Sequence, residues 1–85
     1  MEDRSQDIGF TRGNQWFRCR AAGIIIKDDA ILMVGNDHND YYYSVGGAVQ
    51  LGETAEEACL REIREETGLN LEIERLAFIH ENFFV

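Results

Sequence analysis

The segment between Thr54 and Gly68 constrains the fold more than any other part of this sequence. In the run Thr54-Ala55-Glu56-Glu57, the threonine can cap a helix N-terminus and the last glutamate can complete a capping box. Gly68 is of the residue type that most easily takes the left-handed conformation closing a helix. The sequence therefore predicts one helix between these signals. Its apolar stripe, which should pack on a sheet, consists of Ala55, Cys59, Leu60 and Ile63.

Three glutamates of the predicted helix share one face. Glu62, Glu65 and Glu66 are spaced i, i+3 and i+4. Like charges at this spacing destabilise an isolated helix, and a divalent cation would offset their repulsion, since Mg²⁺ is bound by carboxylate oxygens, waters and substrate phosphates. Residues 53–66 hold six acidic and two basic residues, so this segment has a charge of 2 − 6 = −4, half of the net charge of −8. Spacing alone is equally compatible with a solvated acidic helix balanced by its arginines.

Residues 47–69 resemble the Nudix box, G-x5-E-x7-R-E-U-x-E-E-x-G-U, in which U is aliphatic. The resemblance implies an α+β Nudix fold, an α/β/α sandwich with a mixed sheet. Residues 1–85 would form a single partial domain, truncated at its C-terminal end or completed by another chain. The matching positions are Gly47, Glu53, Arg61, Glu62, Ile63, Glu65, Glu66, Gly68 and Leu69.

The same resemblance implies a Mg²⁺-dependent hydrolase, with Mn²⁺ as a substitute ion. It would cleave the diphosphate linkage of a nucleoside diphosphate bound to another moiety, by attack of water on phosphorus. Arg61 would orient a glutamate through a salt bridge to Glu53, and the general base is left open between Glu65 and Glu62. The implied metal ligands are Glu62, Glu65, Glu66 and the backbone carbonyl of Gly46.

The residues before the helix suggest where a substrate would bind. Gly46-Gly47 lets the backbone approach a ligand closely, so Gly47 is a predicted substrate contact. Tyr43 lies in an aromatic strand predicted over residues 41–45; it could stack on a nucleobase, although a core position is the stronger alternative. Ala48 stands where many relatives carry a basic residue.

Apolar runs predict the remaining strands. Residues 8–11 read as a short edge strand. Residues 17–27 end in an isoleucine cluster that suits burial on both faces, and a turn at Asp28-Asp29 makes a hairpin with residues 30–34. Residues 35–40 read as a loop, and residues 69–79 as a further strand.

Charge and composition exclude several classes of protein. The net charge of −8 disfavours binding to a nucleic-acid polymer, and no apolar run is long enough to span a membrane. The N-terminal residues lack the pattern of a signal peptide. Cys19 and Cys59 have no CxxC spacing and are expected to be buried thiols of a cytoplasmic protein. A homodimer is compatible with the sequence.

Two alternatives remain open at the level of sequence. One is a catalytically silent module that binds nucleotide and metal without turnover, and the other is an inactive fragment of a Nudix domain. The substrate also stays open among oxidised nucleoside triphosphates, ADP-ribose, nucleotide sugars and dinucleoside polyphosphates.

Overall fold

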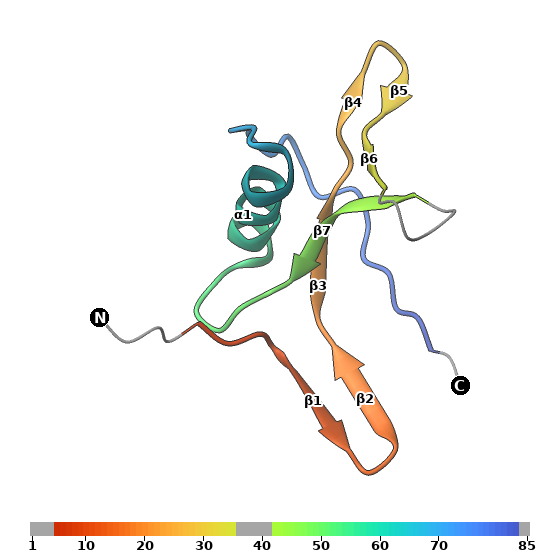
Figure 1. Cartoon of the computed structure of the whole chain (residues 1–85), viewed down its shortest axis with the longest axis vertical. Coiled ribbons are helices and arrows are strands. Elements are labelled where there is room, and N and C mark those ends of the chain that lie inside the picture. The colour runs from red at the N-terminus through yellow and green to blue at the C-terminus, as the bar shows by residue number, and fades with distance from the viewer. Residues whose placement is uncertain (1–4, 36–41, 84–85) are drawn as a thin grey trace.

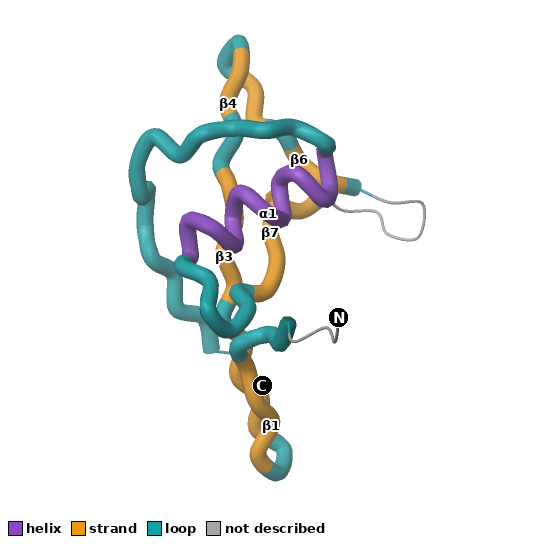
Figure 2. Tube along the Cα trace, turned by 90° about the vertical axis from the view of Figure 1, so that its left-hand side faces the viewer, coloured by secondary structure: helices purple, strands orange, loops and turns teal. Residues whose placement is uncertain are grey.

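A helix packed on one face of a small antiparallel sheet forms the centre of the molecule (Figures 1 and 2). The computed structural model describes residues 5–35 and 42–83. The sheet consists of β3 (Arg20–Gly23), β7 (Tyr43–Ala48) and β6 (Met33–Val34), with β7 in the middle. The helix α1 spans Ala55–Thr67. The other strands are β1 (Gly9–Arg12), β2 (Gln15–Arg18), β4 (Ile26–Lys27) and β5 (Ala30–Ile31).

Strands and one helix in this arrangement confirm the α+β class. Every strand pairing in the described part of the chain is antiparallel, so the parallel pairing of a mixed sheet does not occur within it. No helix among residues 5–35 and 42–83 is both long and apolar enough to cross a membrane.

Two hairpins extend from the central sheet (Figure 1). Strands β1 and β2 pair as one hairpin, which confirms a strand near residues 8–11. Strands β4 and β5 pair through the turn at Asp28 and Asp29, whose φ angles are 54° and 63°. Two positive φ angles in succession define the type I′ turn that suits a two-residue hairpin, and aspartate tolerates them. The predicted turn and hairpin are therefore confirmed for residues 26–27 and 30–31 only, because residues 33–34 form β6 and pair with β7 instead.

The core lies where α1 meets β3 and β7. Val45, Cys59 and Ile63 are its buried cluster. Gly23 permits the close approach, because a Cβ atom there would lie 2.8 Å from Cδ1 of Ile63. The helix is rotated relative to the predicted stripe, since Ala58 is fully buried and Ala55 is exposed.

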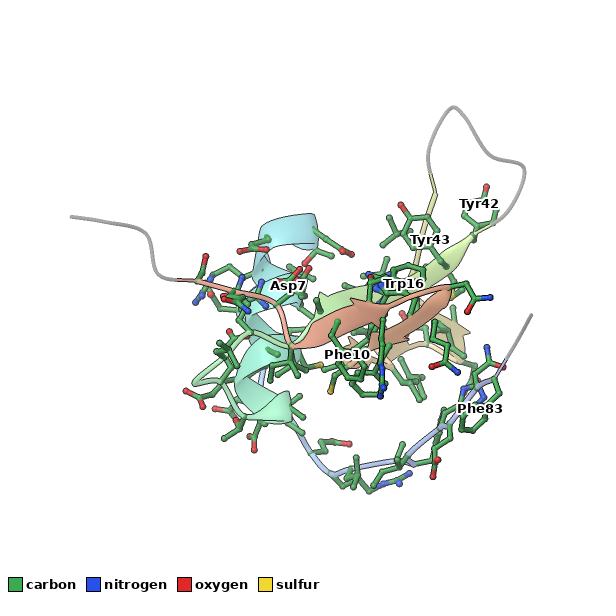
Figure 3. All side chains as sticks on the ribbon, turned by 90° about the horizontal axis from the view of Figure 1, so that it is seen from below. Asp7, Phe10, Trp16, Tyr42, Tyr43 and Phe83 are labelled. Atoms are coloured by element: carbon green, nitrogen blue, oxygen red, sulfur yellow. The ribbon has the colours of Figure 1, made fainter. Side chains whose placement is uncertain are left out.

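Two strand predictions are wrong. Strand β3 ends at Gly23, and Ile24 and Ile26 are 49% and 65% exposed, so the isoleucine cluster is not buried on both faces. Residues 68–83 contain no helix or strand and run as a separate arc beside the sheet, although Ile73 packs against the core (Figure 3). A strand requires a partner for its backbone N–H and C=O groups, and alternation in the sequence does not supply one.

Candidate metal and phosphate site

The two ends of α1 fix the positions of its charged side chains. Thr54 Oγ1 accepts a hydrogen bond from the backbone N–H of Glu57, and the Glu57 carboxylate accepts one from the N–H of Thr54, both at 3.0 Å. At the other end Gly68 has φ 77° and donates its N–H to the carbonyl of Arg64 at 2.9 Å. Both predicted caps are confirmed. Together they fix where the helix begins and where it ends.

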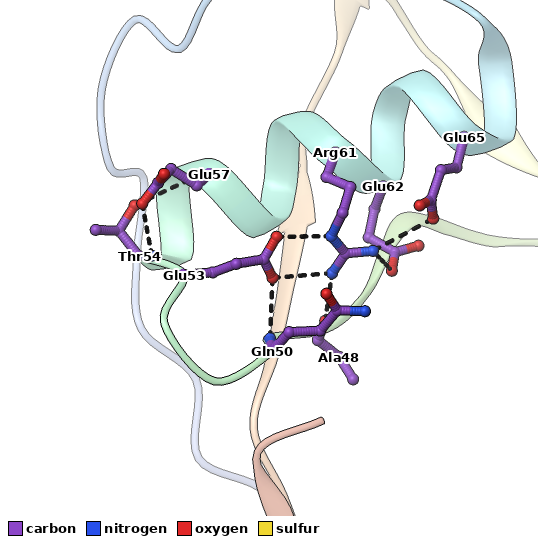
Figure 4. Close-up of polar contacts among 8 residues, drawn as sticks. All are labelled: Ala48, Gln50, Glu53, Thr54, Glu57, Arg61, Glu62 and Glu65. Atoms are coloured by element: carbon purple, nitrogen blue, oxygen red, sulfur yellow. Dashed lines mark hydrogen bonds and ion pairs between the residues drawn. The ribbon is translucent and has the colours of Figure 1, made fainter. Parts of the chain in front are cut away.

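Arg61 is the centre of the polar site, and each of its five N–H donors has an acceptor (Figure 4). Nε and Nη2 bind the two carboxylate oxygens of Glu53, at 2.6 and 3.0 Å. Nη1 donates to Glu62 at 2.8 Å and to Glu65 at 3.3 Å. Nη2 also donates to the carbonyl oxygen of Ala48 at 2.9 Å. The guanidinium therefore joins the loop before the helix, the helix and strand β7.

Glu53 is held from two sides. Its Oε1 accepts a hydrogen bond from the backbone N–H of Gln50 at 2.9 Å, in addition to the two from Arg61. The Arg61 hydrogen bonds, followed by that of Gln50, lower the pKa of Glu53 below its ordinary value. The same ion pair raises the pKa of Arg61. Both groups are consequently charged at neutral pH.

Strand β7 offers a backbone edge to these side chains. It pairs with β6 only at Tyr43 and Ser44, and with β3 along its other edge. In an antiparallel ladder, alternate residues direct both backbone groups to the same edge. Gly46 and Ala48 are two such residues: the backbone of Gly46 hydrogen-bonds the Glu66 carboxylate, and the Ala48 carbonyl accepts from Arg61. The helix is thus attached by polar side chains to the part of β7 that β6 leaves unpaired.

Both glycines of β7 are required by close contacts. A Cβ atom on Gly47 would lie 2.5 Å from the carboxyl carbon of Glu62, and one on Gly46 would meet the backbone of Ala21 and Ala22. The carboxylate of Glu62 therefore occupies the space that a side chain at position 47 would fill. A larger residue there would displace it.

Among the glutamates of the site, Glu66 lies in surroundings that disfavour its ionised form. Although Glu66 is an exposed residue, partial desolvation of its carboxyl group and then the negative charge of Glu62 raise its pKa. The hydrogen bond from the backbone of Gly46 opposes this only in part. A bound cation would relieve both effects, because it favours the ionised carboxylate.

The structure brings most of the predicted site residues together. Arg61, Glu53 and Glu62 are in direct contact, and the side chain of Glu65 lies at the rim, 57% exposed. Among the described residues, no three acidic, histidine or cysteine side chains are close enough to hold a metal ion in this conformation, since Nη1 of Arg61 lies between Glu62 and Glu65. Tyr43 is 37% exposed and is the first residue of β7.

Two backbone groups of the site were not predicted from the sequence. The carbonyl of Ala48 and the N–H of Gln50 both fix the Arg61–Glu53 pair, yet both are backbone groups. No side-chain pattern identifies them. Residues 36–40 of the predicted loop lie outside the described residues. Cys19 and Cys59 are both free thiols, as predicted, but only Cys59 is buried, whereas Cys19 is partly exposed. Burial raises the pKa of the Cys59 thiol, which makes it a poor nucleophile.

The site thus consists of carboxylates on a capped helix, held by an arginine beside a glycine-containing strand. Comparison with known proteins identifies the family. The chain matches the NUDIX domain over residues 17–85 and belongs to that family.

Several curated relatives share this region. An ADP-ribose pyrophosphatase from Methanocaldococcus jannaschii is 43% identical over 61 residues, which cover 68% of this chain and 36% of the relative. A MutT-like protein from Streptomyces ambofaciens is 32% identical over 62 residues, covering 72% and 40%. A dihydroneopterin triphosphate diphosphatase from Escherichia coli is 37% identical over 49 residues, covering 58% and 33%. The chain therefore matches only about two fifths or less of these relatives' length. No solved structure is significantly similar to it.

Proposed function

We propose that this chain carries the metal and catalytic residues of a pyrophosphohydrolase that cleaves a nucleoside diphosphate linked to another moiety. The observation that carries the proposal is the arrangement around Arg61. All five donors of one guanidinium hold Glu53, Glu62 and Glu65 against the backbone edge of β7. A solvated acidic helix would have no reason to fix its carboxylates to a strand.

The donor set fits a hard divalent cation. Glu62, Glu65 and Glu66, together with the carbonyl of Gly46, would hold Mg²⁺ or Mn²⁺, because carboxylate and carbonyl oxygens are the ligands that these ions prefer. The contact at Gly47 supports this fit, because the absence of a side chain there lets the Glu62 carboxylate lie directly against the strand. When bound, the cation offsets the charge of the diphosphate and makes its bound water more acidic.

The side chains of this chain then have distinct roles. Arg61 positions Glu62 through Nη1 and is itself positioned by Glu53. Glu65 is the most exposed of the carboxylates that contact Arg61, and it would accept a proton from the attacking water; Glu62 is the second candidate for this base. Gly47 makes room for the Glu62 carboxylate and so would shape the phosphate site through that side chain, and Tyr43, the first residue of β7, would contact the substrate.

The relatives suggest substrates to test first. ADP-ribose and dihydroneopterin triphosphate each contain the phosphoric anhydride that the proposed reaction breaks, and they occur in the names of two relatives. The α/β/α sandwich with a mixed sheet, the cytoplasmic location and the homodimer stay predictions of the sequence.

The proposal is tested by product release from these two compounds, with and without Mg²⁺. The unmodified chain is compared with a Glu65→Gln, Glu66→Gln double variant, and Glu74→Gln serves as the control because it removes one charge outside the site. Metal-dependent release that the double variant alone loses would support the hydrolase. A folded chain that binds Mn²⁺ tightly and releases no product from either compound would instead support a silent binding module.

A further inference from the structure

We draw no further inference here: the strongest candidate, the apolar surface patch on the face of the sheet opposite α1, carries nothing, because nothing in the described part of the structure shows what covers its side chains, which belong to Ile24, Ile26, Ile31 and Met33 and are 43–65% exposed.

Discussion

A single side chain, Arg61, determines how the carboxylates are arranged. Its guanidinium is planar and presents five donors in a fixed geometry, and all five are used. The pair with Glu53 is bidentate, which is the strongest and most directional form of such contacts. Most of the site's geometry therefore depends on one residue that need not touch a substrate.

Replacing Arg61 with lysine keeps the charge and removes the geometry. A lysine cannot bind Glu53 in two places while also contacting Glu62 and Ala48. Because the side chain of Arg61 is only 17% exposed, we expect the free energy of unfolding to fall by about 2 kcal/mol, the scale of hydrogen bonds to charged groups. Urea unfolding measures the change. Arg64→Lys, an exposed arginine on the same helix, should change stability little, and equal losses in both variants would refute the role of Arg61.

Acid should destabilise the fold through Glu53. Its pKa in the folded chain is lower than the ordinary value of 4.5, because Arg61 and the N–H of Gln50 favour the ionised form. Its stabilising contribution is therefore complete above pH 4.5 and is lost as the pH falls through the lower, folded value. Urea midpoints measured across this range should decline less steeply in Glu53→Gln than in the unmodified chain. Parallel curves would show that another group causes the acid sensitivity.

Glu66 should behave in the opposite way. Partial desolvation and the charge of Glu62 raise its pKa in the folded chain, so its stabilising contribution is complete below the unfolded pKa and is lost as the pH rises through the folded pKa. At neutral pH, without metal, Glu66→Gln should raise the melting temperature, since the amide oxygen can still accept from Gly46. The same variant should bind Mn²⁺ more weakly in a paramagnetic-resonance titration. A lower melting temperature would contradict this explanation, and Glu74→Gln again provides the control.

The helix α1 places these residues because its ends are fixed independently of the site. The Thr54–Glu57 capping box and the left-handed Gly68 are local features, and both lie within a few residues of the groups they bind. Local signals of this kind can be read from a sequence, which is why the helix was predicted correctly. The rotation of the helix was not predicted, because it depends on distant strands, where Gly23 approaches Ile63 and Gly47 approaches Glu62.

Removing the helix cap should weaken the site without touching it. Thr54→Ala deletes the acceptor for the Glu57 N–H and should lower the free energy of unfolding by about 1 kcal/mol. Thr54→Ser retains the hydroxyl and should restore most of the loss. Chemical denaturation distinguishes the variants. If the serine variant were as unstable as the alanine variant, packing of the threonine methyl group would be the cause.

At the scale of the whole molecule, the sequence predicted the α+β class and the content of the polar site, and it failed where distant segments must meet. Glu53, Arg61 and Glu62 were expected to act together, because the family motif specifies them, and the structure places them in contact. The strand over residues 69–79 was predicted from alternation alone, and no pairing partner exists for it among the described residues. Backbone pairing of this kind is decided by the fold and leaves no pattern in the segment itself.

A divalent cation should stabilise the whole chain. Ligands that bind only the folded state stabilise it by mass action, by about 2.7 kcal/mol at a hundredfold excess over the dissociation constant. We therefore expect Mg²⁺ to raise the melting temperature more than Na⁺ at equal ionic strength. The Glu65→Gln, Glu66→Gln variant should respond equally to both salts. An equal response in the unmodified chain would mean that Mg²⁺ only screens its net charge of −8.

The contact between Arg61 and Ala48 has a consequence for comparing sequences. The acceptor is a main-chain carbonyl, which every amino acid possesses, so substitutions at position 48 can preserve the contact whatever side chain they introduce. The motif accordingly writes this position as unspecified. A variable column in a set of related sequences can therefore conceal an interaction that every member makes, and variability there is no sign that the position is idle.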